Sequence, residues 1–238
     1  PHVPLIISGP DARAFLQGQC TSDIQSLQPN HATSTLFCQF QGKVFSSGWV
    51  LCANDHLFIY WTHSSIANIT KERLQLPIAL HKAHLETPSW RTYGLLSNTP
   101  LANLPTTPGR AQLIDETIWA LCLHSSPFTY YLSAPSPILD NWIQSHNLSI
   151  RLIEEWDAQR LQQKELAFCD ASVLRFTANV LYRPPCPQIS LSKGCYVGQE
   201  VIARTYHLGR PKKQVFFLQA QVPLPTMTPG TRLTTRHC

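Results

Sequence analysis

The order of hydrophobic and polar residues in the first half of the chain predicts helix and strand in turn. Pro10 and Asp11 form a start signal ahead of an apolar helical face, which predicts a helix and its exit over residues 10–27. Runs rich in β-branched and aromatic residues follow, and Gln41-Gly42 is typical of a turn between the first two. The predicted elements are strands over 35–40, 43–53 and 57–61, and a helix over 64–76.

Part of this pattern recurs at an offset of 70 residues. Trp49-Val-Leu-Cys52 is matched by Trp119-Ala-Leu-Cys122, and Phe58 and Tyr60 are matched by Phe128 and Tyr130. A helical stretch follows each copy, over 64–76 and 136–146. We interpret this as two copies of a strand-strand-helix-strand unit, with a chance likeness between two hydrophobic hairpins as the alternative.

Antiparallel strands with helices to one side predict an α+β fold. A third helix is expected over residues 154–167, and a proline-rich loop over 179–188. A strand is expected over 214–222. These elements suggest a body over residues 1–205 and a shortened C-terminal β segment over 206–238.

Composition and charge narrow the class of protein. Hydrophobic residues make up 43% of the 238, enough for a sizeable core, and the formal charge is +5. This mild excess is well short of a nucleic-acid-binding tail, so no direct nucleic-acid partner is expected. No apolar stretch reaches membrane-spanning length, and residues 1–10 lack a basic region followed by an apolar one, so we expect neither a membrane span nor a leader there. The eight cysteines show no C-x-x-C spacing, so we expect free thiols, no metal site and a cytoplasmic location.

The segment Lys193-Gly-Cys-Tyr-Val-Gly-Gln-Glu200 concentrates chemically active residues, and we call it the signature. Its two glycines permit tight turns and close approach of a ligand. Positive charge stabilises a thiolate, so Lys193 and Arg204 are expected to activate Cys195. Composition alone equally allows Cys195 to be a small buried residue, the usual state of cysteine.

The signature resembles that of the YgfZ family of folate-binding proteins, relatives of the aminomethyltransferase (T-protein) of the glycine cleavage system. The segment 15–23, Phe-Leu-Gln-Gly-Gln-Cys-Thr-Ser-Asp, is similar to the family's Gln-Gly-Gln-x-Thr-x-Asp stretch, and we call it the first motif. The segment 38–43, Cys-Gln-Phe-Gln-Gly-Lys, is similar to the family's Cys-Asp-x-x-Gly-Lys, and we call it the turn motif. The resemblance extends over about residues 5–220.

The resemblance implies a duplicated ferredoxin-like ββαβ body of the aminomethyltransferase folate-binding type. It also implies tetrahydrofolate as ligand, an essential Cys195, and a role in supporting iron–sulfur client proteins, including the cluster enzymes that modify tRNA. The ligand is expected in a central cleft bordered by the first motif and the signature. The implied binding residues are Gln17, Gln19, Thr21, Asp23, Lys193, Tyr196, Gln199, Glu200 and Arg204.

Several positions depart from the family pattern. Gln39 replaces an aspartate, the loop before the signature reads Tyr182-Arg183, and Lys164 stands where the family has a glycine. Ser46 and Ser47 replace the acidic pair of true aminomethyltransferases, and a hydroxyl cannot do a carboxylate's proton and charge work. Three hypotheses remain: folate-dependent maintenance of iron–sulfur proteins, a folate-dependent one-carbon transferase, and an interaction module that has lost the ligand.

Overall fold

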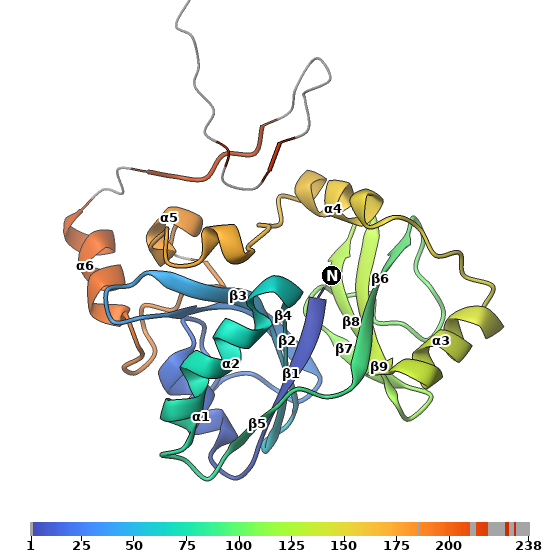
Figure 1. Cartoon of the computed structure of the whole chain (residues 1–238), viewed down its shortest axis with the longest axis horizontal. Helices are drawn as coiled ribbons and strands as arrows, with labels where there is room; N and C mark the ends of the chain where they lie inside the picture. The colour runs from blue at the N-terminus through green and yellow to red at the C-terminus, as the bar shows by residue number, and fades with distance from the viewer. Residues whose placement is uncertain (1, 185, 210–212, 219–226, 229–230, 232–238) are drawn as a thin grey trace, which may run out of the picture.

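The computed structural model describes residues 2–184, 186–209, 213–218, 227–228 and 231. Two antiparallel sheets stand side by side, with helices covering their outer faces (Figure 1). The first sheet has the order β2-β3-β4-β1-β5 and the second β6-β9-β8-β7. The strands are β1 His2–Ser8, β2 His31–Cys38, β3 Val44–Asn54, β4 Leu57–His63, β5 His84–Glu86, β6 Trp90–Ser97, β7 Ala111–Ile114, β8 Ile118–Ser125 and β9 Phe128–Pro135.

Helices α1 Ala12–Gln19 and α2 Ser64–Ile78 belong to the first half, and α3 Ser136–Ser145 follows the second sheet. Three further helices complete the described chain: α4 Ile153–Gln162, α5 Ala178–Leu181 and α6 Gln199–Leu208, with a 3-10 turn at Asp170–Ser172. Alpha-helices and antiparallel sheets together confirm a mixed α/β fold.

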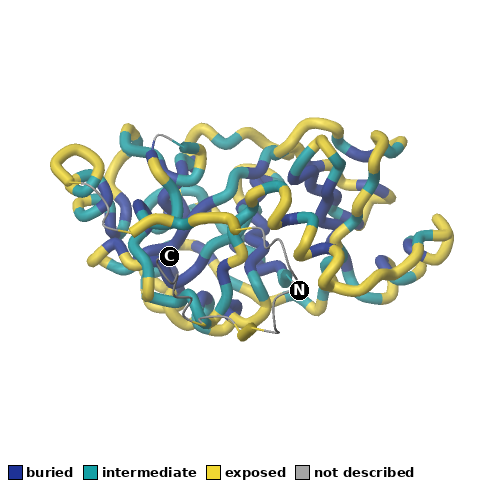
Figure 2. The backbone as a smooth tube through the Cα atoms, turned by 90° about the horizontal axis from the view of Figure 1, so that it is seen from above, coloured by how far each residue is buried: buried dark blue, intermediate teal, exposed yellow. Residues whose placement is uncertain are grey.

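The two sheets meet through a shared apolar cluster. Trp61 and Leu51 of the first sheet pack with Tyr131 and Leu121 of the second, and Trp156 of α4 joins them. Figure 2 shows buried segments running through both halves, with exposed segments around the rim. The fold therefore has a continuous interior, and α4 lies over the junction between the sheets.

The likeness between the halves takes a different form from the predicted one. Trp49 and Trp119 lie in β3 and β8, which occupy equivalent places, because β2-β3-β4-β1 and β7-β8-β9-β6 are the same strand order. Among the described residues, however, α3 is followed by α4 and not by a strand, so the second half does not repeat the β-β-α-β order. The ferredoxin-like duplication stays a prediction.

The register also corrects the constant offset of 70. Cys52 pairs with Phe58, whereas Cys122 pairs with Tyr130, so Phe58 corresponds to Tyr130 and not to Phe128. The slip is of two residues. Because side chains alternate between faces, such a slip keeps the aromatic residues on the same face of the sheet.

The predicted C-terminal β segment lies largely outside the described residues. The described part of the expected strand, residues 214–218, has no helix or strand assignment. The predicted boundary at residue 205 falls inside α6, which continues to Leu208. The division into two domains therefore stays a prediction.

Candidate functional site

The signature forms a loop that leads directly into α6. Gly198 precedes the first residue of this helix and has φ +87°, in the left-handed region. The end of the signature therefore forms the start of a helix. Cys195 lies on the loop and is exposed.

The first motif and the signature lie side by side although about 170 residues separate them in the chain. The amide of Ser190 donates to Thr21 O at 2.8 Å, and the amide of Val197 donates to Gly18 O at 3.1 Å. The buried Thr21 hydroxyl donates to Gln188 O and accepts from the amide of Leu36 at 3.1 Å. Thr21 thus joins three segments, and this contact explains why a threonine stands in the first motif.

The turn motif contacts the signature from another side. A Cβ placed on Gly198 would lie 3.1 Å from Cys38 Cβ and 3.2 Å from Gly42 Cα. Gly42 has φ +71°, and a Cβ there would lie 3.3 Å from Val201 Cβ. All three motifs found in the sequence therefore converge at one place, and glycine at 42 and 198 permits the close approach.

Lys193 is directed into the protein. Its ammonium group donates to three backbone oxygens, those of Gln17, Cys20 and Ser22, each at 2.7 Å. Its Nζ also lies 4.8 Å from the ring centroid of Tyr196. Burial lowers the pKa of Lys193 to about 8, with Cys20 and Asp23 opposing the shift. An ammonium has three donors, so this group is fully engaged by the carbonyls rather than directed at the Cys195 thiol.

Other predicted ligand-binding side chains are also engaged within the protein. Gln17 accepts from the amides of Ile24 and Gln25 and donates to Asp23 Oδ1 at 3.0 Å. The buried Tyr196 hydroxyl donates to Ser190 O at 3.0 Å, so its ring packs in the core instead of presenting a face for stacking.

The remaining predicted residues lie at the edges of this region. Gln199 donates to Lys193 O at 3.4 Å, and the half-buried Gln19 ends α1. Arg204 lies 4.0 Å from Glu200 one turn along α6, and both side chains are exposed. Exposed ion pairs contribute little to stability, so this pair is not expected to stabilise α6 appreciably.

Cys195 differs from the other described cysteines by its exposure. Cys20, Cys38, Cys52 and Cys122 are buried, and burial raises the pKa of the Cys20 and Cys38 thiols to about 12. Cys169 and Cys186 are half-buried. Accessibility, more than nearby positive charge, distinguishes the signature thiol.

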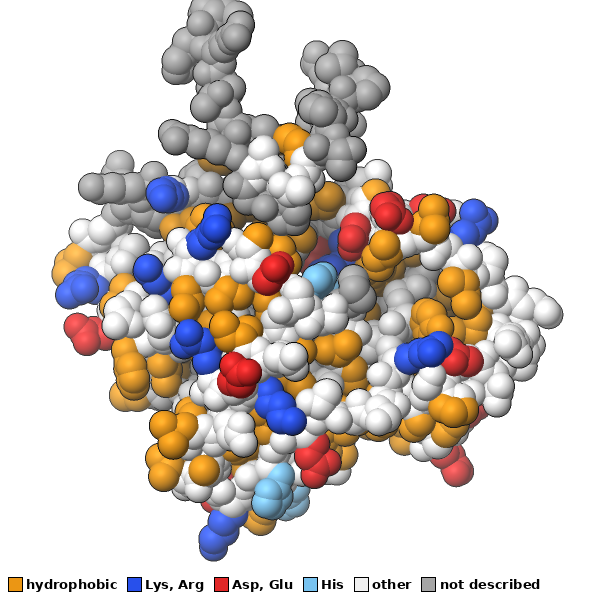
Figure 3. Space-filling view, viewed as in Figure 1, with side chains coloured by type: hydrophobic (Ala, Val, Ile, Leu, Met, Phe, Trp, Pro, Cys, Tyr) orange, Lys and Arg blue, Asp and Glu red, His pale blue; other side chains and the backbone are white. Residues whose placement is uncertain are grey.

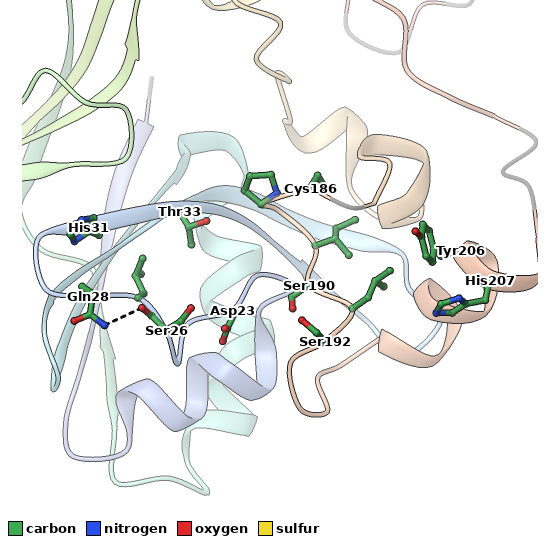
Figure 4. Close-up of a pocket in the computed structure, with 14 residues that line it drawn as sticks. Asp23, Ser26, Gln28, His31, Thr33, Cys186, Ser190, Ser192, Tyr206 and His207 are labelled. Carbon is green, nitrogen blue, oxygen red and sulfur yellow. Dashed lines mark hydrogen bonds between the residues drawn. The ribbon is translucent and has the colours of Figure 1, made fainter.

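An open groove of about 950 Å³ borders this region (Figure 4). Its walls come from the loop around Ser26 and Gln28, from β2, from the loop 186–192 and from Tyr206 and His207 of α6. Among the predicted ligand-binding residues, Asp23 lines it. Burial acts to raise the pKa of Asp23, but hydrogen bonds from Ser26, Gln17 and Gln25 and the charge of Lys193 hold it below its usual value.

The groove falls within the size range of small-molecule sites, which commonly enclose about 300–1,000 Å³. The predicted set of polar side chains does not match it, since Gln17, Thr21, Lys193 and Tyr196 already bond within the protein. We therefore assign no step of chemistry to the ligand.

A second, smaller pocket of about 120 Å³ lies where the two sheets meet. The hydroxyl of Tyr131 and Nε2 of His124 are buried there without a hydrogen-bond partner among the described residues. Arg160 and Glu165 also line it and pair at 2.9 Å. This polar pocket was not predicted, although two opposite charges five residues apart, in a chain with few charges, are a usable signal in the sequence.

The turn after α4 positions that ion pair. The amide of Glu165 donates to Arg160 O at 2.9 Å, and that of Lys164 donates to Leu161 O at 3.0 Å, the two bonds of a Schellman motif. Lys164 has φ +57° at the position where glycine is preferred. Lys164 therefore adopts a backbone conformation that a glycine at this position would favour.

The visible surface carries mixed charge. In Figure 3, basic and acidic side chains are interspersed with apolar ones over the face shown. No helix in the described parts of the chain has the length and apolar character to cross a membrane. Within the same residues, no group of three or more His, Cys, Asp or Glu side chains is arranged to hold a metal ion.

Comparison with known proteins finds similarity to several tRNA-modifying proteins named YgfZ. It is 25% identical over 243 residues to the tRNA-modifying protein YgfZ of Edwardsiella ictaluri, covering 91% of this chain and 68% of that protein. It is 22% identical to the tRNA-modifying protein YgfZ of Colwellia psychrerythraea, covering 92% and 69%. The predicted resemblance to the YgfZ family is confirmed. No family model matches the chain.

The chain is also similar to a human protein in sequence and to a bacterial crystal structure in fold. The chain is 26% identical over 259 residues to the human mitochondrial iron-sulfur cluster assembly factor IBA57, covering 97% of this chain and 68% of that protein. The crystal structure of glycine cleavage system aminomethyltransferase T from Bartonella henselae matches with a TM-score of 0.75 at 10% identity. The match covers 87% of this chain and 62% of the other, and at this identity it shows a shared fold.

Proposed function

We propose that this YgfZ-like chain supports the assembly or repair of iron–sulfur proteins, including the cluster enzymes that modify tRNA, and that it does so through Cys195. The observation that carries the proposal is the presentation of the exposed Cys195 on a loop that both other motifs hold in place. The names of the relatives, a tRNA-modifying protein and an iron-sulfur cluster assembly factor, support the same function.

In this proposal the chain's residues have distinct tasks. Cys195 is the accessible thiol that meets the client protein. Gly42 and Gly198 allow the turn motif to pack against the signature, and Thr21 ties the first motif to the loop before it. Lys193 is engaged by three backbone carbonyls and is not directed at the thiol.

Tetrahydrofolate is the proposed ligand on the strength of the family resemblance. The open groove beside Asp23 has suitable size, and two of its lining residues, Ser190 and Ser192, come just before the signature in the chain. Bound there, a folate would lie beside the segment that leads into the Cys195 loop. We further propose a cytoplasmic location, with neither membrane nor nucleic acid as a direct partner.

A one-carbon transferase is a weaker candidate. Ser46 is fully buried, and its hydroxyl lies 2.8 Å from Tyr60 Oη, 3.3 Å from Thr62 Oγ1 and 2.8 Å from Thr70 Oγ1. This position is part of a hydroxyl cluster in the core and has no carboxylate to hold a proton near an aminomethyl nitrogen. An assay for folate-dependent turnover of aminomethyl groups should give no activity.

An interaction module without ligand is the third candidate, favoured by the internal engagement of Gln17, Lys193 and Tyr196. Titrating the purified chain with tetrahydrofolate, by calorimetry, separates it from the leading proposal. Saturable binding that weakens in Asp23→Asn but not in the exposed-site control Glu72→Gln supports the folate proposal. Absence of binding, with Cys195-dependent rescue of cells lacking their own copy, would leave the iron–sulfur role and reject the ligand.

A further inference from the structure

The C-terminal end of α1 has backbone carbonyls that need partners from outside the helix, as every helix end does. The amide of Cys20 donates to Leu16 O, so the carbonyls of the helix residues after Leu16 still need partners. Gln17 O, one of them, accepts from Lys193, and the same ammonium continues to Cys20 O and Ser22 O on the chain that leaves the helix. A cation also interacts favourably with the negative end of the helix dipole.

We propose that Lys193 is the positioning residue of the Cys195 loop: its ammonium group ties the loop to the C-terminal end of α1 and fixes where the thiol is presented. This rests on the proposed role of Cys195 and adds to it. The expected role of Lys193 as the thiol's electrostatic partner is replaced by an attachment to three carbonyls.

The surroundings of Lys193 favour this role. Two backbone bonds bracket it, from Ser190 to Thr21 and from Val197 to Gly18, so the ammonium lies at the middle of the contact between the two segments. The ring of Tyr196 lies against the same ammonium, with its centroid 4.8 Å from Nζ. With its pKa lowered to about 8, Lys193 is still mainly charged at neutral pH and retains all three donors.

Loss of the ammonium should free the loop without unfolding the protein. Hydrogen bonds to charged groups are stronger than those between neutral groups, and unpaired buried carbonyls add a cost. We therefore expect Lys193→Met to speed amide hydrogen exchange at Ser190 and Val197 by about tenfold or more. Amides in the centre of β3, such as Val50, should exchange at the wild-type rate.

The experiment compares Lys193→Met, Lys193→Arg and the exposed-site control Lys82→Met by amide exchange, with melting temperature as a check on the fold. The same variants are tested for rescue of cells that lack their own copy. Lys193→Met should show fast amide exchange in the loop and should not rescue the cells. Lys193→Arg should reverse at least half of the change in exchange rate and at least half of the loss of rescue. Lys82→Met should exchange at the wild-type rate. Recovery by arginine is the readout that a role in packing alone would not produce.

Exchange at Ser190 and Val197 within twofold of wild type in Lys193→Met would overturn the proposal, as would full rescue by that variant. Exchange needs neither folate nor a client. A Cys195→Ala variant that rescues fully would therefore reject the proposed function while the exchange data still decide whether Lys193 anchors the loop.

Discussion

The carbonyl oxygen of Gln39 lies 2.9 Å from the point where a Cβ on Gly198 would stand. This approach joins the turn motif to the signature, and it occurs at a residue with φ +87°. Both the space and the backbone conformation therefore exclude a larger residue. A Cβ on Gly194, four residues earlier, would meet no atom of the described chain within 4 Å beyond its own neighbours in sequence.

Gly198→Ala should destabilise the protein, whereas Gly194→Ala should not. The left-handed conformation alone costs a residue with a Cβ about 1–2 kcal/mol, and the contact with Gln39 O adds to this. Urea unfolding of the two variants beside wild type measures the difference. Equal stability of the two would contradict the packing of the signature on the turn motif.

Lys164 offers the opposite test, because a lysine there adopts the conformation that glycine prefers. Lys164→Gly removes the strain, and Lys164→Ala keeps it. The glycine variant should be more stable than the alanine variant by about 1 kcal/mol. Thermal unfolding of the pair checks this, and an alanine variant as stable as the glycine variant would argue against a strained Schellman turn.

Local patterns predicted much of the first half because its hydrophobic runs are long and are separated by polar turns. The helix at 64–78 and the hairpin around Asp55 and His56 follow directly from them. The strand β1 was missed, since Pro4 interrupts a short apolar run. So was β6, because Gly94 interrupts its apolar residues.

The candidate site was predicted in its segments but not in its side-chain roles. Sequence motifs placed the first motif and the signature at one cleft, and the structure brings these two segments into contact, with the turn motif packed against the signature as well. Whether Lys193 faces the thiol or the helix end depends on long-range packing that no local pattern records. The Arg160–Glu165 pair differs, because it is local and forms across the turn that ends α4.

Acid should weaken the protein through Glu165. Burial acts to raise its pKa, but nearby His124 and the paired Arg160 outweigh this and lower the pKa to about 2. A carboxylate with a depressed folded-state pKa stabilises the fold above its ordinary value of 4.5, and the stabilisation is lost as pH falls toward 2. Between these two pH values the free energy of unfolding should fall by on the order of 3 kcal/mol.

Glu165→Gln removes that dependence. Its stability should lie below wild type at about pH 7 by roughly 3 kcal/mol or more, since Arg160 is left buried without its partner. The gap should narrow between pH 4.5 and pH 2. The control Glu72→Gln, on the exposed face of α2, should change stability by less than about 0.5 kcal/mol. Urea unfolding at several pH values measures both, and a gap that stays constant with pH would refute the role of Glu165.

Cys195 should react with iodoacetamide faster than the other six described cysteines, because it is exposed while four of them are buried and two half-buried. Burial raises the pKa of Cys122 to about 11, which further slows its alkylation.

Cys195→Ala should keep the free energy of unfolding within about 0.5 kcal/mol of wild type, since removing an exposed side chain leaves no cavity. The same variant should fail to rescue cells lacking their own copy. Cys169→Ala is the matched control at a half-buried site outside the three motifs, and it should rescue fully. Mass spectrometry of alkylated peptides over time gives the order of reaction, and slow labelling of Cys195 together with full rescue by Cys195→Ala would remove the thiol from the mechanism.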